Sequence, residues 1–285
     1  MNGSTNSALE IERYAAFTEN GGGGNPAGVV ICETLPDAAV MQRIAADVGY
    51  SETVFAAPDG PEWRVRYFAP TMEVPFCGHA TIALGIALAQ RSGDGIFSLR
   101  LNTGTVRVEG RVSQGAAFAQ LWSPPTHSGP VDGDFLAAAL GLFGLSGADL
   151  DPRLRPAMMH AGANHLLIAV ATREALGSMA YELEAGRRVM ALKDLATICL
   201  VHAETPILFH ARNPFAAGGV YEDPATGAAA AALGGYLRDI AWPHGGRITV
   251  LQGEDMGQPC RLTVGINASP GASVTVSGTV RRLST

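Results

Sequence analysis

The chain has 285 residues, which is long enough for one large domain or two ordinary ones. Hydrophobic residues make up 47% of it and charged residues only 16%, and this balance excludes a disordered or fibrous protein. The formal net charge is −6, and lysine and arginine do not cluster with aromatic residues, so we expect no nucleic-acid partner.

Membrane, disulfide and metal chemistry are not indicated by the sequence. No run reaches the ~18 uninterrupted apolar residues of a membrane span, and residues 1–10 lack the features of a signal peptide, which favours a cytoplasmic protein. The seven histidines form no HxxxH or HExxH pair, so we expect no metal site. The four cysteines have no CxxC spacing and are expected to be free thiols: Cys32, Cys77, Cys199 and Cys260.

The first half of the chain alternates short strands with two helices. Strands are expected where apolar or alternating runs are bounded by glycine and proline. In chain order the expected elements are strands at 11–17 and 24–32, a helix at 36–49, strands at 52–58 and 62–70, a helix at 78–90, and strands at 97–104 and 105–112. The glycines of 21–24 match no phosphate-binding motif, so no nucleotide cofactor is expected, and none of another kind is indicated.

The second half follows the same plan. It offers a strand region at 156–172, a helical region at 173–195, a strand at 204–215, a helix at 224–237, and strands at 246–253 and 258–266. Three residue pairs keep one offset, since 212 − 66, 220 − 74 and 223 − 77 all equal 146: Arg66 and Arg212, Val74 and Val220, Cys77 and Asp223. The sequence therefore predicts an internal duplication.

The duplication predicts an α+β fold with two pseudo-symmetric halves. The helices at 78–90 and 224–237 are rich in alanine and glycine, which suits a helix enclosed on all sides by a curved sheet. A linker rich in proline, glycine and acidic residues spans 123–134. We expect an N-terminal half of residues 1–123, completed by a last strand at about 274–285, and a C-terminal half of residues 124–273.

Two helix N-termini that face each other would form a site for a carboxylate. A helix N-terminus exposes unpaired N–H groups and a partial positive charge. Groups beside such a site could act on the carbon next to the bound carboxylate, because the same donors stabilise the charge that develops when that carbon loses a proton. The expected ligand is a small carboxylate-bearing substrate.

Five motifs resemble the PhzF-like phenazine biosynthesis isomerase family, in the diaminopimelate epimerase-like fold group. They occur in family order over nearly the whole chain: GNPAGVV (24–30), SETVF (51–55), RYFAPTMEVPFCGHAT (66–81), EDPATGAAA (222–230) and QGEDMGQP (252–259). The resemblance implies two diaminopimelate epimerase-like domains, a homodimer, and a cofactor-independent isomerase. Such an enzyme would move a proton within a small cyclic amino or hydroxy carboxylic acid.

The resemblance also implies the roles of particular residues. Glu52 matches the general acid/base, and His79 and Asp223 match its catalytic partners. The expected substrate-binding residues are Asn25, Gly78, Ala80, Thr226 and Gly227. Without the resemblance, an outward-facing strand position for Glu52 would be the default. A structural hydrogen bond for His79, and a helix cap at Asp223 with Pro224 as the first helical residue, would also be the simplest interpretations.

Cys77 invites a competing hypothesis, an amino-acid racemase or epimerase of the same fold. Such relatives use two cysteines on opposite faces of one carbon, but Asp223, Pro224 and Ala225 stand where the second thiol would be needed. We therefore expect Cys77 to be a packing thiol. A catalytically silent metabolite-binding protein is the third hypothesis. Two departures from the family pattern, Ala228 for serine and Gln258 for arginine, leave the substrate open.

Overall fold

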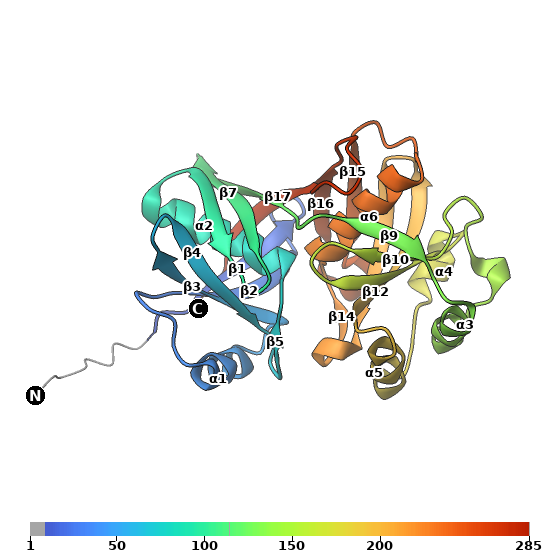
Figure 1. Cartoon of the computed structure of the whole chain (residues 1–285), viewed down its shortest axis with the longest axis horizontal. Coiled ribbons are helices and arrows are strands. Elements are labelled where there is room, and N and C mark those ends of the chain that lie inside the picture. Colours follow the sequence, from blue (N-terminus) through green and yellow to red (C-terminus); the bar gives the residue numbers. More distant parts are fainter. Residues whose placement is uncertain (1–8, 114, 285) are drawn as a thin grey trace, which may run out of the picture.

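The computed structural model describes residues 9–113 and 115–284. It shows two lobes side by side, each with strands wrapped around one helix (Figure 1). The first lobe contains β1 (Glu12–Thr18), β2 (Asn25–Ile31), α1 (Ala38–Val48), β3 (Glu52–Asp59), β4 (Glu62–Phe68), β5 (Glu73–Val74), α2 (Gly78–Ser92), β6 (Gly95–Arg100), β7 (Thr105–Ser113) and β8 (Ala116–Trp122).

The second lobe repeats the order of strands and helices, with extra helices on its outer side. It contains β9 (His127–Pro130), α3 (Gly133–Leu142), β10 (Ala157–His160), β11 (Asn164–Ala169), α4 (Arg173–Gly177), α5 (Leu183–Ala191), β12 (Leu195–Thr205), β13 (Leu208–Phe215), β14 (Val220–Asp223), α6 (Gly227–Asp239), β15 (Arg247–Gln252) and β16 (Cys260–Gly265). The last strand, β17 (Thr275–Arg282), follows it. No helix in the described part of the chain is long and apolar enough to cross a membrane.

Strand pairing confirms the internal duplication. β2 runs parallel to β3 and β11 runs parallel to β12. β4 and β6 form a further parallel pair, and so do β13 and β15. Arg66 on β4 pairs with Glu73, as Arg212 on β13 pairs with Glu222. The two lobes are therefore copies of one arrangement.

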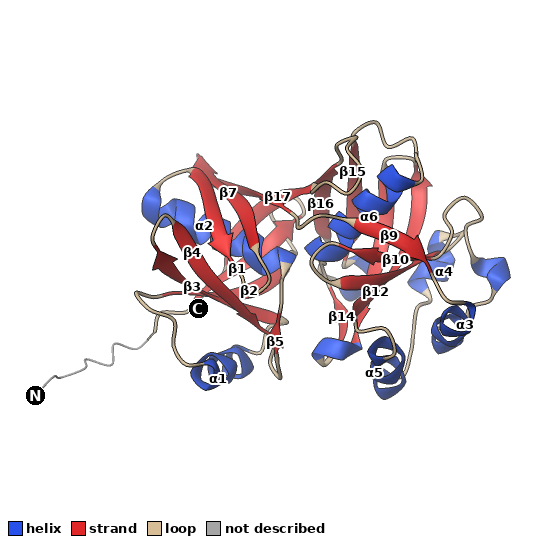
Figure 2. Cartoon of the chain, in the orientation of Figure 1, coloured by secondary structure: helices blue, strands red, loops and turns tan. Residues whose placement is uncertain are grey.

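The central helix of each lobe is enclosed by its strands, as the alanine and glycine content predicts (Figure 2). Every residue of α2 from Gly78 to Ala89 is buried, and so is every residue of α6 from Gly227 to Arg238. The strands approach so closely that a Cβ on Gly234 would lie 2.8 Å from Val264 Cγ1. Small residues are needed because a larger side chain would push the sheet away from the helix.

The last strand, β17, joins the two lobes. It pairs with β1 and β8 of the first lobe and with β16 of the second. The described strands thereby form one continuous sheet. β17 consequently fixes the two lobes against each other at one edge of the boundary between them.

Two expectations about helices are wrong. The region 173–195 is not one helical segment, because it breaks into α4 and α5, and β12 already begins at Leu195. The Glu182 side chain accepts hydrogen bonds from the N–H groups of Glu184 and Ala185, which starts α5 as a separate helix. The other error lies at the start of α6, which begins at Gly227 and not at Pro224.

The start of α6 shifts because other side chains hold the preceding loop. Thr226 is the N-cap, and its N–H donates to Gln252 Oε1 at 3.2 Å. Gln252 Nε2 donates in turn to the Asp223 carbonyl at 2.6 Å. These bonds keep residues 223–225 out of the helix, so Asp223 is the last residue of β14 and not an N-cap.

Candidate active site

The starts of α2 and α6 lie against each other, as predicted. A Cβ on Gly78 would lie only 2.8 Å from Gly227 Cα and 3.0 Å from Ala228 N. The first intrahelical bonds are made by the N–H groups of Thr81 and Ala230. The N–H groups of 78–80 and 227–229 precede them and have no partner within their helices. Two sets of backbone donors therefore converge on one point.

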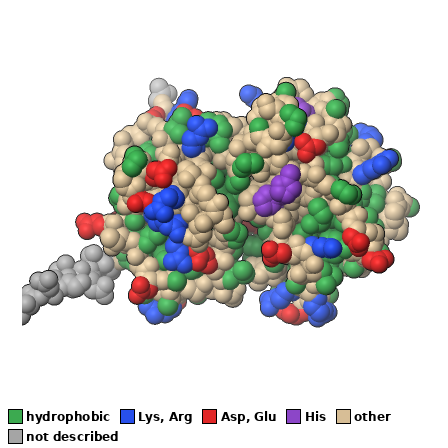
Figure 3. Space-filling model, viewed as in Figure 1, with side chains coloured by type: hydrophobic (Ala, Val, Ile, Leu, Met, Phe, Trp, Pro, Cys, Tyr) green, Lys and Arg blue, Asp and Glu red, His purple; other side chains and the backbone are tan. Residues whose placement is uncertain are grey.

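A cavity of about 350 Å³ opens beside this point and receives residues from both lobes. This volume suits a small molecule. Its lining residues with polar or titratable side chains are Glu52, Cys77, His79 and Thr103 from the first lobe and His160, Asn164, His165, Asp194, Thr197, Asp223 and Thr226 from the second. Histidine side chains also gather on the surface near the boundary of the lobes (Figure 3).

Glu52 points into this cavity and not outward. It is the first residue of β3, it is 6% exposed, and its Oε2 has no hydrogen-bond partner among the described residues. Burial and, to a smaller extent, the nearby Asp223 charge together raise the pKa of Glu52 to about 8, against the smaller opposing effect of hydrogen bonds from Ser51 and Cys77. A carboxyl group with such a pKa can accept and return a proton near neutral pH.

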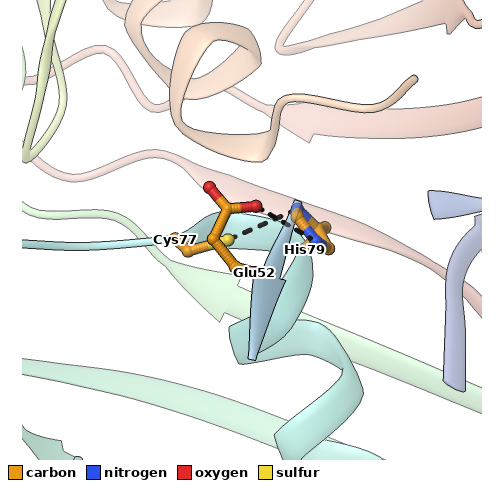
Figure 4. Close-up of side chains that lie close together, drawn as sticks. All are labelled: Glu52, Cys77 and His79. Atoms are coloured by element: carbon orange, nitrogen blue, oxygen red, sulfur yellow. Dashed lines mark hydrogen bonds and ion pairs between the residues drawn. The ribbon is translucent and has the colours of Figure 1, made fainter. Parts of the chain in front are cut away.

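His79 lies beside Glu52 at the start of α2 (Figure 4). Its Nε2 is 3.6 Å from Glu52 Oε2 and 3.4 Å from Ser51 Oγ, while its Nδ1 is 3.3 Å from Cys77 Sγ. Burial lowers the pKa of His79 to about 3, so the imidazole is neutral at physiological pH. A neutral His79 can hold the Glu52 side chain in position, and because it carries no positive charge it does not stabilise the ionised form of Glu52.

Asp223 faces the cavity from the second lobe and is held by two side chains. Asn25 Nδ2 donates to Oδ1 at 2.6 Å, and Thr226 Oγ1 donates to Oδ2 at 2.6 Å. Burial raises the pKa of Asp223 to about 7, although both hydrogen bonds act in the opposite direction. The charge of Glu222 also raises the pKa of Asp223, and the charge of Asp223 in turn disfavours the ionisation of Glu52.

Most of the predicted site residues come together in this cavity. Its wall contains Glu52, Gly78, His79, Asp223, Thr226 and Gly227. Asn25 and Ala80 do not line it. Asn25 is fully buried and contacts Asp223 and the Ala225 carbonyl, and Ala80 is enclosed within α2. Asn25 thus acts through Asp223, and a direct contact of either residue with substrate stays a prediction.

Cys77 is the one thiol among the described residues that line the cavity. Burial raises the pKa of Cys77 well above the ordinary thiol value, and the charge of Glu52 adds to this effect. A thiol held in its protonated form is a poor base. The geometry therefore favours Glu52 over Cys77 as the group that accepts a proton.

One group of metal-ligand types lies close together in the described structure: the candidate ligand atoms of Glu52, Cys77 and His79 lie within 4.8 Å of one another. Cys77 faces Nδ1 of the imidazole, whereas Glu52 faces Nε2. An ion bound to one ring nitrogen of His79 would therefore lie on the side of only one of the other two ligands. The group therefore fits a hydrogen-bonded arrangement better than a metal centre.

Part of the cavity wall comes from β11 and β12, and no sequence motif predicted it. His165 and Thr197 lie in the cavity lining, and the ring nitrogen Nδ1 of His165 is 2.8 Å from Thr197 Oγ1. The available signal was a histidine at the start of an otherwise apolar strand, in the run "NHLLIAV" (164–170). A lone histidine of this kind is not specific enough to predict a site.

The chain is similar along nearly its whole length to proteins of one family. The PhzC-PhzF family, described as "Phenazine biosynthesis-like protein", matches residues 14–282. An uncharacterised isomerase of Mesorhizobium japonicum is 35% identical over 285 residues, which cover 93% of each chain. The trans-2,3-dihydro-3-hydroxyanthranilate isomerase of Pseudomonas aeruginosa is 30% identical over 265 residues, covering 88% of this chain and 89% of that relative.

The fold has a close counterpart among solved structures. The crystal structure of a Bacillus anthracis phenazine biosynthesis protein of the PhzF family superimposes with a TM-score of 0.81 at 25% identity, over 97% of each chain. The expected diaminopimelate epimerase-like fold is thereby confirmed. The chain therefore belongs to the phenazine biosynthesis-like PhzF family and, like its named relatives, is an isomerase.

Proposed function

We propose that the protein shifts a proton between carbons of a small, cyclic amino or hydroxy carboxylic acid, with Glu52 as the group that carries the proton. One observation carries the proposal: an unpartnered oxygen of the buried Glu52 carboxyl group lies in a cavity wall beside two facing helix N-termini. No cofactor is assigned a role in this reaction.

The substrate carboxylate binds at the paired helix starts. The N–H groups of 78–79 and 227–228, which belong to the cavity wall, replace water around it, so its burial costs little. Ala228 lines the cavity with a methyl group, so at this position only the backbone can donate to the ligand. The same donors stabilise the negative charge that spreads toward the carboxylate when the adjacent carbon loses a proton.

Glu52 accepts the proton from one carbon while the C–H electron pair moves into the conjugated system. The double bond shifts, and Glu52 returns the proton to another carbon, so that substrate and product have the same composition. Neutral His79 keeps Glu52 in place, and Asp223 with Thr226 binds an amino or hydroxyl group of the substrate. The pKa of Glu52, raised by burial to about 8, suits a group that both accepts and donates near neutral pH.

The test compares wild type with Glu52→Gln on trans-2,3-dihydro-3-hydroxyanthranilate and related cyclic amino-hydroxy acids, followed by NMR. Glutamine keeps the shape of the side chain but cannot carry the proton, so turnover should fall by about 10²–10⁴-fold. Binding should survive, because the helix N-termini hold the carboxylate. Glu12→Gln is the matched control, since Glu12 has the same 6% exposure and pairs with Arg91 away from the cavity. Near-normal turnover of Glu52→Gln would remove Glu52 from the mechanism.

A further inference from the structure

Two buried side-chain atoms that line the cavity have no hydrogen-bond partner within the described residues. One is Glu52 Oε2 from the first lobe, and the other is His165 Nε2 from the second. The His165 side chain is 1% exposed. A buried polar atom without a partner costs about 1–3 kcal/mol, so its persistence in a cavity wall points to a ligand that completes it.

The neighbours of His165 decide which hydrogen bond its free nitrogen can make. Thr197 Oγ1 donates to Asn213 Oδ1 at 3.2 Å and lies 2.8 Å from His165 Nδ1. A hydroxyl group has one hydrogen, so toward His165 the Thr197 oxygen can only accept. Nδ1 therefore carries the proton, and Nε2 of the neutral ring is a bare acceptor.

The charge state of the ring supports this assignment. Burial lowers the pKa of His165 to about 3, and nearby His160 acts in the same direction. His160 itself, which also lines the cavity, has its Nδ1 2.9 Å from Asn164 Oδ1. His165 is thus a neutral ring in the cavity wall. The hydrogen bonds that link His165, Thr197 and Asn213 fix its tautomer and its orientation.

The internal duplication shows which residues of the first lobe are equivalent to His165 and Thr197. Phe55 lies opposite Arg66 on β4, and Leu200 lies opposite Arg212 on β13. Counting three residues back from Phe55 and Leu200 places Thr197 where the first lobe has Glu52. His165 pairs with Thr197 across β11 and β12, as Ala27 pairs with Glu52 across β2 and β3. The strand pair that carries Ala27 and the proton-carrying Glu52 in the first lobe therefore carries the neutral acceptor His165 and Thr197 in the second.

We propose that His165 determines specificity by accepting a hydrogen bond, at Nε2, from a hydroxyl group of the substrate, and that Thr197 is the residue that fixes its tautomer. This inference rests on the proposed function and adds a requirement to it. A carboxylic acid without a second donor that reaches His165 leaves Nε2 unsatisfied and binds more weakly. The second lobe therefore selects the substrate that the first lobe converts.

The first experiment measures affinity by calorimetry for 3-hydroxyanthranilate and for its O-methyl ether, which cannot donate from that oxygen. Wild type should prefer the hydroxy compound by about tenfold or more, the usual cost of one unpaired buried acceptor. His165→Phe should lose the preference, and Glu52→Gln should keep it. Equal binding of the two compounds by wild type, or a preference that survives in His165→Phe, would overturn the inference.

The second experiment needs no ligand and covers the case in which His165→Phe fails to fold. ¹⁵N NMR of the wild-type protein should show a protonated Nδ1 and an unprotonated Nε2 for His165. Thr197→Val removes the acceptor at Nδ1 and should move the proton toward Nε2, with a matching loss of the preference. A protonated Nε2 in wild type would overturn the assignment.

The two proposals can fail separately. Normal turnover in Glu52→Gln removes the proposed proton carrier and leaves the recognition result untouched. Equal affinity for the two probes removes the role of His165 and leaves the chemistry at Glu52 standing. Failure of wild type to bind either probe at millimolar concentration would overturn the role of His165 toward this class of acid.

Discussion

Gly78→Ala tests whether the contact between the helix starts builds the carboxylate site. The new Cβ would lie 2.8 Å from Gly227 Cα, whereas carbon atoms in contact are about 3.5–4.0 Å apart. The two helix starts must therefore separate by about 0.7–1.2 Å, the difference of those distances. Overpacking of this kind costs about 1–3 kcal/mol of stability.

The larger expected effect is on activity. A displacement of about 1 Å between substrate and catalytic group costs about 10²-fold in rate. We expect Gly78→Ala to lose about that factor in turnover and to bind 3-hydroxyanthranilate more weakly, because its backbone donors no longer converge. The assays are NMR turnover, calorimetric affinity and thermal unfolding of the same preparation.

Gly85→Ala is the matched control in the same helix. Its Cβ would lie 2.6 Å from Val108 Cγ2, a side-chain atom away from the cavity wall, so it should lower stability without lowering affinity. Wild-type turnover and affinity in a folded Gly78→Ala protein would refute the reasoning that the paired helix starts hold the carboxylate.

The remaining predictions concern a thiol, a pH dependence and an ion pair. Cys77→Ala should lower stability modestly and keep most activity, and complete loss of turnover in the folded variant would revive the racemase hypothesis. Because the pKa of Glu52 is raised, the folded state still holds a proton at pH values above 4.5, where the unfolded state releases it. The protonated Glu52 therefore contributes its full stability below pH 4.5, and this stability is lost as the pH rises toward about 8. Urea unfolding of Glu52→Gln should therefore show less loss of stability over that range than wild type, and parallel curves would contradict the assignment. Arg212→Met leaves the buried Glu222 unpaired and should cost about 3–5 kcal/mol. Arg66→Met, at the equivalent but more exposed pair, should cost about 0–1 kcal/mol in the same unfolding assay.

The sequence predicted those parts of the structure that depend on local composition and on the repeat. The small residues of α2 and α6 indicated enclosed helices, and the offset of 146 residues predicted equivalent places for these helices in the two halves. The helix starts themselves do not keep this offset, since 227 − 78 = 149. The Gln252 hydrogen bonds that hold this loop come from a distant strand, so no local pattern could predict them.

The candidate site was predictable only in part, for a related reason. Glu52, His79 and Asp223 lie within recognisable motifs, so the resemblance placed them together. His165 owes its importance to Thr197 and Asn213, which follow 32 and 48 residues later in the chain and become its neighbours only when β11, β12 and β13 pair. The free acceptor on His165 is a property of that assembled chain of hydrogen bonds and of no single motif.

The position of β17 affects how the protein can fold during synthesis. In the first lobe, β1 and β8 both pair with β17, so the ribosome must release nearly the whole chain before that sheet can close. Thr18 Oγ1 and Thr279 Oγ1 lie 2.7 Å apart although 261 residues separate them in sequence. Contacts between such distant residues form slowly, because a long loop must close first. The sheet of the N-terminal lobe should therefore stay incomplete at one edge until the C-terminal lobe and β17 have been synthesised. For the same reason, a fragment that ends at the linker after Ser123 should not fold alone.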